Sequence, residues 1–325
     1  MNQHLYRYAG NPEQMFGVRK VQCLEGRAAG CTIIEAYTAE GLRVDILPDT
    51  GLDLGAVHYR GKNMSFISKN GYDSPNTNLP YETEFINTFS GGMLYTCGLR
   101  STGPANRDGD EWHPVHGRFH SLRASEVCAS VQGEQIVVSG TLRESALFGH
   151  CLQVKRQITL PVNGSTITVE DTIQNLTPRP EEFMLLYHYN FGYPMLSEKA
   201  KLVLPHKRKT TPRTDFAAEE LEQALEFDSP VDSEEERVFF HELSNPWARL
   251  ENSELEMAAT LRWSGDSLPI LVQWRSMASG DYALGLEPSN SYIKGRAEER
   301  KNGTLRTIAG FESVKTKLTL DFQTL

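Results

Sequence analysis

The stretch LQVKRQITLPVNGSTITVEDTI, residues 152–173, decides the fold class. Apolar residues alternate with polar ones on both sides of Asn163 and Gly164, which is the period of a strand with one buried and one solvated face. Asn-Gly between two such runs is the strongest short signal for a β-hairpin. The stretch therefore predicts two long antiparallel strands joined by a tight turn.

The same alternation recurs along most of the chain on either side of this hairpin. Clusters of Gly, Pro, Asn and Asp separate the alternating runs, as is typical of antiparallel sheets. Asp49 and Asp53 lie in one such cluster and are typical of turn residues. Further strands are predicted at Thr32–Thr38, Leu42–Leu47, Gln135–Arg143, Glu256–Trp263, Leu268–Arg275, Asp281–Glu287 and Val314–Phe322.

Only one segment has a helical pattern. Residues Phe216–Phe227 fit a helix with Thr214 or Asp215 as its N-cap, because a short polar side chain there can accept a hydrogen bond from the first turn. The segment from Asp215 to Glu236 carries ten acidic residues and no basic one. We interpret it as a solvated excursion on the surface.

The composition excludes several classes of protein. Of the 325 residues, 39% are hydrophobic and 23% are charged, which is typical of a folded chain. A net charge of −9 argues against nucleic acid or anionic membranes as partners, since both bind basic surfaces. No run approaches the roughly 18 apolar residues of a membrane-spanning helix, and the N-terminal residues do not fit a signal peptide.

The five cysteines are scattered, and none lies in a Cys-x-x-Cys pair. Without an export signal, this favours free thiols in a reducing compartment, and we expect a cytoplasmic protein with no disulfide or metal framework. No repeat and no Pro/Ser-rich linker divides the chain. Many strands, few helices and no linker predict a single all-β domain over residues 1–325, most simply a two-sheet sandwich.

Three histidines within eight residues, His113, His116 and His120, form the first candidate cluster. Imidazoles bind transition metals, but the proline and glycine between them break any helix that would stack the rings, and no metal site is predicted. On a strand, His116 and Arg118 would share a face. These two residues form either a polar site or part of a surface loop.

A second cluster lies in the run Phe183–Pro194, where His188 and Asn190 share one face near the end of an otherwise apolar strand. Buried polar groups need hydrogen-bond partners. His188 is therefore either a core histidine with a structural partner or a histidine at the mouth of a cleft. In the second case, aromatic neighbours such as Tyr187 are candidates for stacking on a sugar.

The third candidate is Glu287, which closes the apolar strand Leu-Gly-Leu-Glu before a proline. A partly buried carboxyl has a raised pKa unless donors hold it ionised, which makes Glu287 a candidate general base. Alone, a structural glutamate at a strand end is the simpler interpretation. Arg100 is a candidate for binding a hydroxyl or carboxylate, and Gln273 is a further candidate for contact with substrate.

These clusters together resemble the aldose 1-epimerases, or galactose mutarotases. Residues Val169–Phe191 resemble the middle of that family, with its Asn-Leu-Thr turn at Asn175 and its histidine at His188. Gly-Leu-Glu287-Pro is similar to the strand that bears the family's catalytic glutamate, and His116 with its following glycine is similar to the second histidine. The strings LYHYNFGYP and TCGL are most similar to a bacterial subgroup of unknown function.

The resemblance implies a large antiparallel β-supersandwich and an enzyme that interconverts the α and β anomers of a sugar without metal or cofactor. Glu287 would take the proton of the anomeric hydroxyl, His188 would protonate the ring oxygen, and His116 would orient the sugar. A glutamate and a histidine, with reference pKa values of about 4.3 and 6.5, suit this exchange near neutral pH. The residues expected to bind the substrate are Arg118, Arg100, Asn190, Tyr187 and Gln273.

Two features of the better-known mutarotases are not evident in this sequence. Those proteins have an upstream Asn-Arg pair and an aspartate between the second histidine and the glutamate. Arg100 or Arg118 is the candidate for the arginine, and Asp215 is the candidate for the aspartate. The departure leaves open which sugar binds, whether aldose or ketose, free or phosphorylated.

Other function classes stay open. A non-catalytic carbohydrate-binding or regulatory protein can share the fold, because a fold does not dictate a function. A lyase or glycosidase is less favoured, since a glycosidase needs two carboxylates about 5–10 Å apart and only Glu287 has a convincing context. We expect a small-molecule sugar as partner, with no nucleic acid and no membrane, and the sequence leaves a homodimer open.

Overall fold

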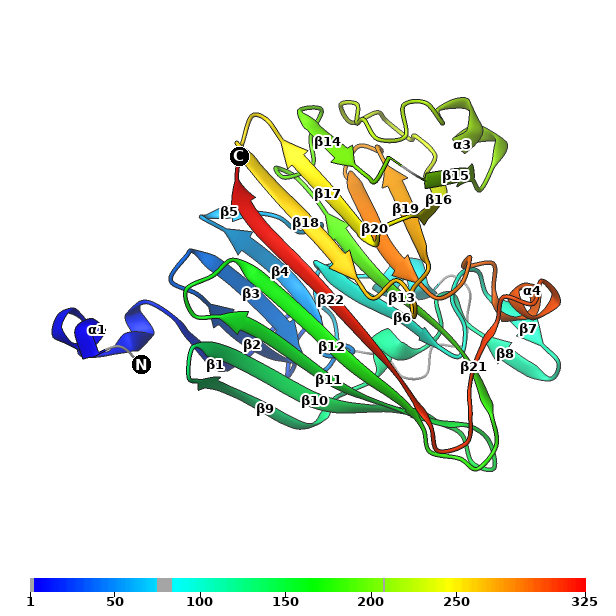
Figure 1. Cartoon of the computed structure of the whole chain (residues 1–325), viewed down its shortest axis with the longest axis horizontal. Helices are drawn as coiled ribbons and strands as arrows, with labels where there is room; N and C mark the ends of the chain where they lie inside the picture. Colours follow the sequence, from blue (N-terminus) through cyan, green and yellow to red (C-terminus); the bar gives the residue numbers. More distant parts are fainter. Residues whose placement is uncertain (1–2, 75–83, 207) are drawn as a thin grey trace.

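Two antiparallel sheets lie face to face in the computed structural model, which describes residues 3–74, 84–206 and 208–325 (Figure 1). Short helices lie at the periphery of this sandwich. The predicted antiparallel all-β sandwich with few short helices is thereby confirmed. In the described ranges, no helix is both long enough and apolar enough to span a membrane.

The larger sheet has twelve strands. They are β1 (Gly17–Gln22), β2 (Thr32–Tyr37), β3 (Leu42–Leu47), β4 (Asp53–Tyr59), β5 (Lys62–Asn63), β6 (Leu94–Leu99), β13 (Glu181–Phe191), β15 (Arg208–Pro212), β16 (Arg237–Leu243), β19 (Ile270–Ser276), β20 (Ala283–Ser289) and β21 (Arg306–Ile308). Their order is β1-β2-β3-β4-β6-β13-β20-β19-β16-β15, with β5 beside β4 and β21 beside β13.

The smaller sheet has eight strands. They are β9 (Ser125–Gln132), β10 (Gln135–Ser145), β11 (Cys151–Pro161), β12 (Thr166–Asn175), β14 (Ala200–Val203), β17 (Trp247–Asn252), β18 (Met257–Trp263) and β22 (Ser313–Thr324). Their order is β14-β17-β18-β22-β12-β11-β10-β9. The hairpin predicted around Asn163 and Gly164 is β11 with β12, and the other predicted strands also occur, with ends shifted by no more than two residues.

The remaining elements are short. They are α1 (Gln3–Tyr8), α2 (Glu84–Thr88), α3 (Asp215–Glu219), α4 (Arg296–Lys301), the 3₁₀ turns η1 (Pro12–Gln14) and η2 (Phe119–Ser121), and the ribbon of β7 (Asn106–Asp108) with β8 (Glu111–His113).

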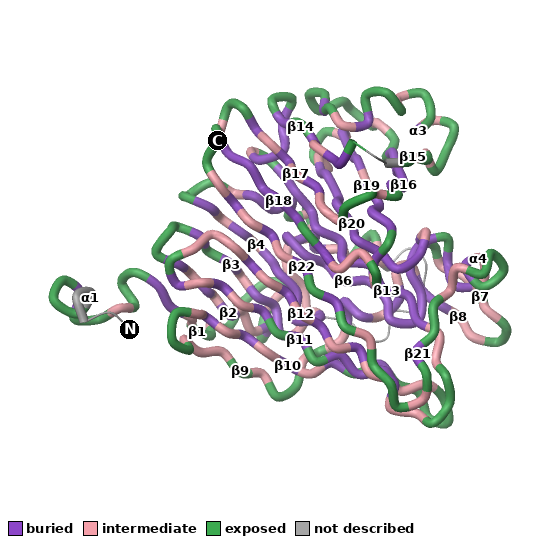
Figure 2. Tube along the Cα trace, viewed as in Figure 1, coloured by how far each residue is buried: buried purple, intermediate pink, exposed green. Residues whose placement is uncertain are grey.

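The apolar core fills the space between the two sheets. Figure 2 shows buried segments along the central strands of both sheets and exposed segments at the turns. The alternation in β11 and β12 gives the reason, because every second side chain faces the opposite sheet and loses its contact with water. The buried apolar residues of this hairpin are Leu152, Val154, Ile158, Leu160, Ile167, Val169 and Ile173.

A buried ionic cluster interrupts this apolar core. Arg156 and Asp171 occupy inward-facing positions opposite one another on β11 and β12, and the Arg156 guanidinium donates to both Asp171 carboxylate oxygens at 2.9 and 2.7 Å. Arg156 also pairs with Asp53, which begins β4 and is buried rather than lying in a turn. The Tyr187 hydroxyl donates to Asp171 at 2.6 Å, so the cluster joins both sheets behind the middle of β13.

The predicted helix over Phe216–Phe227 is wrong beyond its first turn. Thr214 caps α3 as expected, since its hydroxyl accepts from the Ala217 amide at 3.1 Å, but α3 ends at Glu219. The next residue, Glu220, binds Arg237 and Arg275 through its carboxylate. These tertiary contacts outweigh helix propensity, which is a weak preference by comparison.

Candidate active site

His188 and Glu287 meet on the face of the larger sheet that points away from the core. β13 and β20 are neighbours, and their register pairs Tyr189 with Leu286, which sets His188 opposite Glu287. Nε2 of His188 lies 3.1 Å from Oε1 of Glu287. His116, in the loop after β8, lies with its ring centroid 6.2 Å from that of His188. The three residues predicted as catalytic are therefore adjacent.

Gly285 leaves the space that this pair occupies. It precedes Glu287 by two residues and so lies on the same face of β20. A Cβ at this position would lie 2.5 Å from Oε1 of Glu287 and 3.0 Å from Cε1 of His188. Any larger residue would thus displace the carboxylate or the imidazole.

A cavity of about 440 Å³ opens over the pair, within the range of roughly 300–1,000 Å³ that is usual for small-molecule sites. β13, β20, β19 and β16 lie side by side beneath it. Its lining combines the three catalytic candidates with aromatic, aliphatic and charged side chains. These other residues are Phe66, Ser68, Lys69, Asn70, Phe85, Ile86, Asn87, Phe89, Arg213, Glu236, Val238, Val272, Trp274, Asp281 and Ile293.

Two ion pairs contribute the charges of the cavity wall. Nζ of Lys69 lies 2.8 Å from Oδ2 of Asp281, and the Arg213 guanidinium lies 2.6 Å from Oε1 of Glu236. The Trp274 indole donates to the second oxygen of Glu236 at 2.7 Å, which holds the ring at the cavity wall. All four charged side chains are partly exposed to solvent.

Sequence reasoning missed these charged residues. Glu236 is the last residue of the acidic segment, which we interpreted as a solvated surface, and the segment is indeed largely exposed until Glu236 enters the cavity. Asp215, the expected counterpart of the family's aspartate, begins α3 instead and does not line the cavity. The sequence feature that could have pointed to Glu236 is its position directly before a strand, β16.

Burial sets the protonation of the catalytic candidates. Burial lowers the pKa of His188 to about 3, with the nearby His116 adding to the effect and Asn190 opposing it. Burial raises the pKa of Glu287 well above its ordinary value, with Glu236 adding and Arg213 opposing. Burial also lowers the pKa of His116 to about 4. The unliganded site therefore favours a protonated Glu287 and neutral histidines.

Oε1 of Glu287 is buried and has no hydrogen-bond partner among the described residues. Its contact with His188 is close, at 3.1 Å, but the atom still has capacity to accept or donate another hydrogen bond. A buried polar atom without such a bond is energetically unfavourable. A hydroxyl group on a ligand in the cavity would relieve this deficit.

The two arginines predicted to bind substrate lie elsewhere. Arg100 is buried and pairs with Glu111, at 2.6 Å, and with Glu181 beside a separate shallow groove. Arg118 donates to the Trp112 carbonyl at 3.4 Å. Neither arginine lines the cavity, because both bind acceptors in β8 instead and Arg100 also binds one at the start of β13.

The other three predicted substrate-binding residues also lie outside the cavity lining. Tyr187 and Gln273 each precede a cavity residue by one position, so strand alternation turns them to the opposite face. Gln273 there donates to the Ala224 carbonyl at 2.6 Å. Asn190 shares the face of His188, but its amide donates to the carbonyls of Gly92 and His188, both at 2.9 Å.

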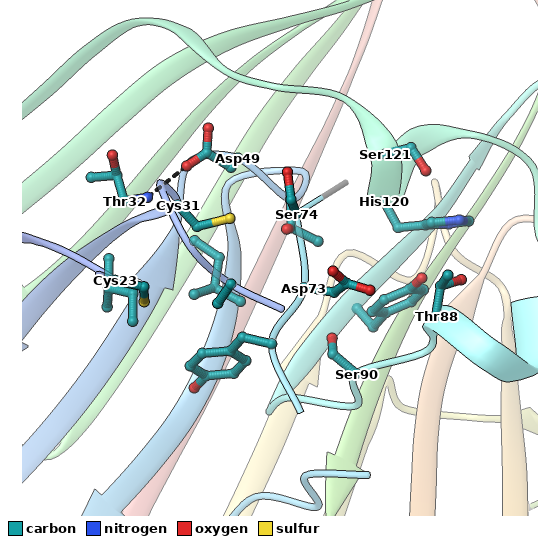
Figure 3. A pocket seen from close by; sticks show the side chains of 16 residues that line it. Cys23, Cys31, Thr32, Asp49, Asp73, Ser74, Thr88, Ser90, His120 and Ser121 are labelled. Atoms are coloured by element: carbon teal, nitrogen blue, oxygen red, sulfur yellow. Dashed lines mark hydrogen bonds between the residues drawn. The ribbon is translucent and has the colours of Figure 1, made fainter. Parts of the chain in front are cut away.

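A second, much smaller cavity has His120 in its wall (Figure 3). Its volume is about 40 Å³, enough for a water molecule or two but too small for a sugar. Figure 3 shows Asp49 in its wall, accepting from the Thr32 amide at 2.7 Å, with Cys31 and Ser74 nearby. Within the described ranges, no group of three or more His, Cys, Asp or Glu residues is placed to hold a metal ion.

Comparison with known proteins assigns the chain to a family. A family model described as a domain of unknown function, DUF4432, matches residues 28–322. The chain belongs to the DUF4432 family. No curated protein matches it.

Solved structures share the fold of this DUF4432 protein. A Klebsiella pneumoniae protein described as a "putative aldose 1-epimerase" is 22% identical, with a TM-score of 0.89 over 96% of this chain and 86% of that chain. A galactose mutarotase-like protein from Clostridium acetobutylicum is 15% identical, with a TM-score of 0.66 over 96% and 100%. A galactose 1-epimerase from Lactobacillus acidophilus is 16% identical, with a TM-score of 0.62 over 95% and 99%. The fold is therefore galactose mutarotase-like, as the sequence resemblance implied.

Proposed function

We propose that this protein is a sugar mutarotase, which binds a sugar in the 440 Å³ cavity and interconverts its anomers. The observation that carries the proposal is the buried contact between His188 and Glu287 at the cavity wall, with Oε1 of Glu287 left without a hydrogen-bond partner in the described part of the chain. Anomer exchange needs one acid and one base at a single ring, and this pair provides both.

The reaction consists of two coupled proton transfers. The Glu287 carboxylate takes the proton of the anomeric hydroxyl, the bond between the anomeric carbon and the ring oxygen breaks, and the His188 imidazolium protonates that oxygen. The open-chain carbonyl rotates, and ring closure runs the same transfers in reverse. In the unliganded pair the proton lies on Glu287. Transfer of this proton across the 3.1 Å contact to Nε2 of His188 gives the carboxylate and the imidazolium that carry out the reaction.

The remaining wall is suited to holding a sugar ring. Phe89 and Trp274 lie with ring centroids 5.8 and 5.5 Å from that of His188, and aromatic faces bind the apolar C–H faces of sugars through dispersion. The ring centroid of His116 lies 6.2 Å from that of His188, and His116 is placed to orient a hydroxyl. Exclusion of water by these rings strengthens the interactions of the charges that form during the reaction.

The test is anomer exchange followed by NMR over a panel of aldoses and ketoses. Glu287→Gln and His188→Asn should each lower the exchange rate by roughly 10²–10⁴ while leaving the fold intact. Glu251→Gln, on β17 of the smaller sheet, is the matched control and should retain the wild-type rate. Wild-type protein that binds sugars without accelerating their exchange would instead support the non-catalytic carbohydrate-binding alternative.

The other expectations drawn from the sequence stay predictions. A cytoplasmic location can be tested by cell fractionation, and a homodimer can be tested by sedimentation. The sugar as partner, and the lack of affinity for nucleic acid, can be tested by titration with each ligand.

A further inference from the structure

We propose that the cavity accepts an uncharged deoxy sugar, one that lacks a hydroxyl where the sugar faces the aliphatic wall formed by β16, β19 and the loop before α4. This inference rests on the proposed function, because it names the class of sugar that the His188–Glu287 pair would act on. Two independent observations carry it, the aliphatic character of that wall and the pairing of the cations around the cavity.

The aliphatic wall is formed by Val238, Val272 and Ile293, which all line the cavity. Val272 is directly opposite Glu287 in the pairing of β19 with β20, and such neighbours have Cβ atoms about 4.5–5.5 Å apart. Val238 is directly opposite Trp274 in the pairing of β16 with β19. This wall therefore lies immediately beside the carbon that would react.

None of these three side chains can form a hydrogen bond. A sugar hydroxyl facing them would lose its bonds to water without replacement, which is unfavourable, whereas a methyl or methylene group there would gain by burial. Two polar residues of the cavity lining, Ser68 and Asn70, already use hydrogen-bond donors within the protein, because both donate to the Phe89 carbonyl, at 2.5 and 3.0 Å. The cavity is thus poorly matched to a sugar with a hydroxyl on every carbon.

The charge pattern disfavours anionic sugars. Among the described residues that line the cavity, each of the two cationic side chains forms an ion pair, Lys69 with Asp281 and Arg213 with Glu236. A phosphate or carboxylate on the sugar would have to displace one of the protein's own carboxylates to find a cation.

The first experiment compares sugars that differ by one group. Anomer exchange and binding are measured for D-galactose against 6-deoxy-D-galactose, for D-glucose against 2-deoxy-D-glucose, and for D-glucose 6-phosphate. One deoxy member should exceed its parent in kcat/KM by about ten- to a hundredfold, as is usual for one misplaced hydroxyl, and the phosphate should be the poorest substrate. Parents equal to or better than both deoxy sugars would overturn the proposal, as would a preference for the phosphate.

Two variants and one control variant test the two observations separately. Val272→Thr keeps the shape of the side chain and adds a hydroxyl, so it should reduce the preference for the deoxy sugar several-fold, whereas Val272→Ala adds no such group and should not. Asp281→Asn removes the partner of Lys69 and should improve binding of D-glucose 6-phosphate several-fold. An unchanged preference in Val272→Thr, or no gain for the phosphate in Asp281→Asn, would contradict the corresponding argument.

The binding measurement, by saturation-transfer NMR, separates this inference from the proposed function. If deoxy sugars bind more tightly than their parents but no exchange is accelerated, the mutarotase proposal fails and the substrate class stands. If exchange is accelerated but favours the hydroxylated parents, the function stands and the substrate class fails. If no sugar of the panel binds or exchanges, both proposals are overturned.

Discussion

The clearest consequence of the site geometry concerns Gly285. In Gly285→Ala, the new Cβ would lie 2.5 Å from Oε1 of Glu287, whereas ordinary contacts begin at 3.4 Å, so the carboxylate must move by about 0.9 Å. The same Cβ would also press on Cε1 of His188 and on Cβ of Trp274, both at 3.0 Å, so the imidazole cannot simply take up the strain. A misplacement of about 1 Å in a catalytic group can lower a rate by roughly 10².

We therefore expect Gly285→Ala to lower the anomer-exchange rate by about a hundredfold, measured by NMR on the most active sugar. Gly10→Ala is the control, because a Cβ there meets no atom within 4 Å. Thermal melting checks the fold, since an alanine compatible with strand geometry changes stability by only about 1 kcal/mol or less. A folded Gly285→Ala protein that works within twofold of the wild-type rate would refute the argument that this glycine makes room for the catalytic pair.

Three further predictions rest on buried ionisable groups. The working pair holds one proton, which rests on Glu287 in the unliganded site, so the exchange rate should fall as the pH rises through the raised pKa of Glu287, above which no proton is left for His188 to donate; a pH–rate profile that instead falls from pH 7 to pH 4 would contradict this. Burial raises the pKa of Glu144 from 4.5 to about 7, so its contribution to stability is fully present below about pH 4.5 and is lost as the pH rises towards 7. Calorimetry should therefore show that Glu144→Gln raises Tm relative to the wild type more at pH 8 than at pH 5. A difference in Tm that does not change with pH would argue against this. Arg156→Met would leave Asp53 and Asp171 buried without their cation and should lower the free energy of unfolding by roughly 3–5 kcal/mol in urea titrations, while a loss below 1 kcal/mol would show that the cluster is not stabilising.

Strand positions were predictable where the alternation of residues is regular. The hairpin of β11 and β12 follows from its period and from Asn163-Gly164, because these are local properties of the backbone. The same alternation places Tyr187 on the face opposite His188 and Gln273 on the face opposite Trp274. The chemistry of both side chains predicts contact with substrate, whereas the geometry of a strand argues against it.

Polar residues inside the core were harder to anticipate. Arg156 and Asp171 occupy inward-facing positions in otherwise apolar rows, and the alternation was evident without them. Burial of a charge is tolerated only when a partner lies within reach. One partner, Asp53, is about a hundred residues distant in sequence, at the start of β4. Only the packing of one sheet on the other brings it to Arg156.

The sequence by itself determined the class of fold and named His116, His188 and Glu287, because strand period, hairpin turns and family resemblance are all carried by short stretches of residues. The tertiary structure alone decided what surrounds them. It paired β13 with β20 to bring His188 to Glu287, and it turned Arg213 and Glu236 into the cavity wall. Such contacts join segments that are distant in the chain, and their register depends on how the whole sheet packs, which no local pattern of residues records.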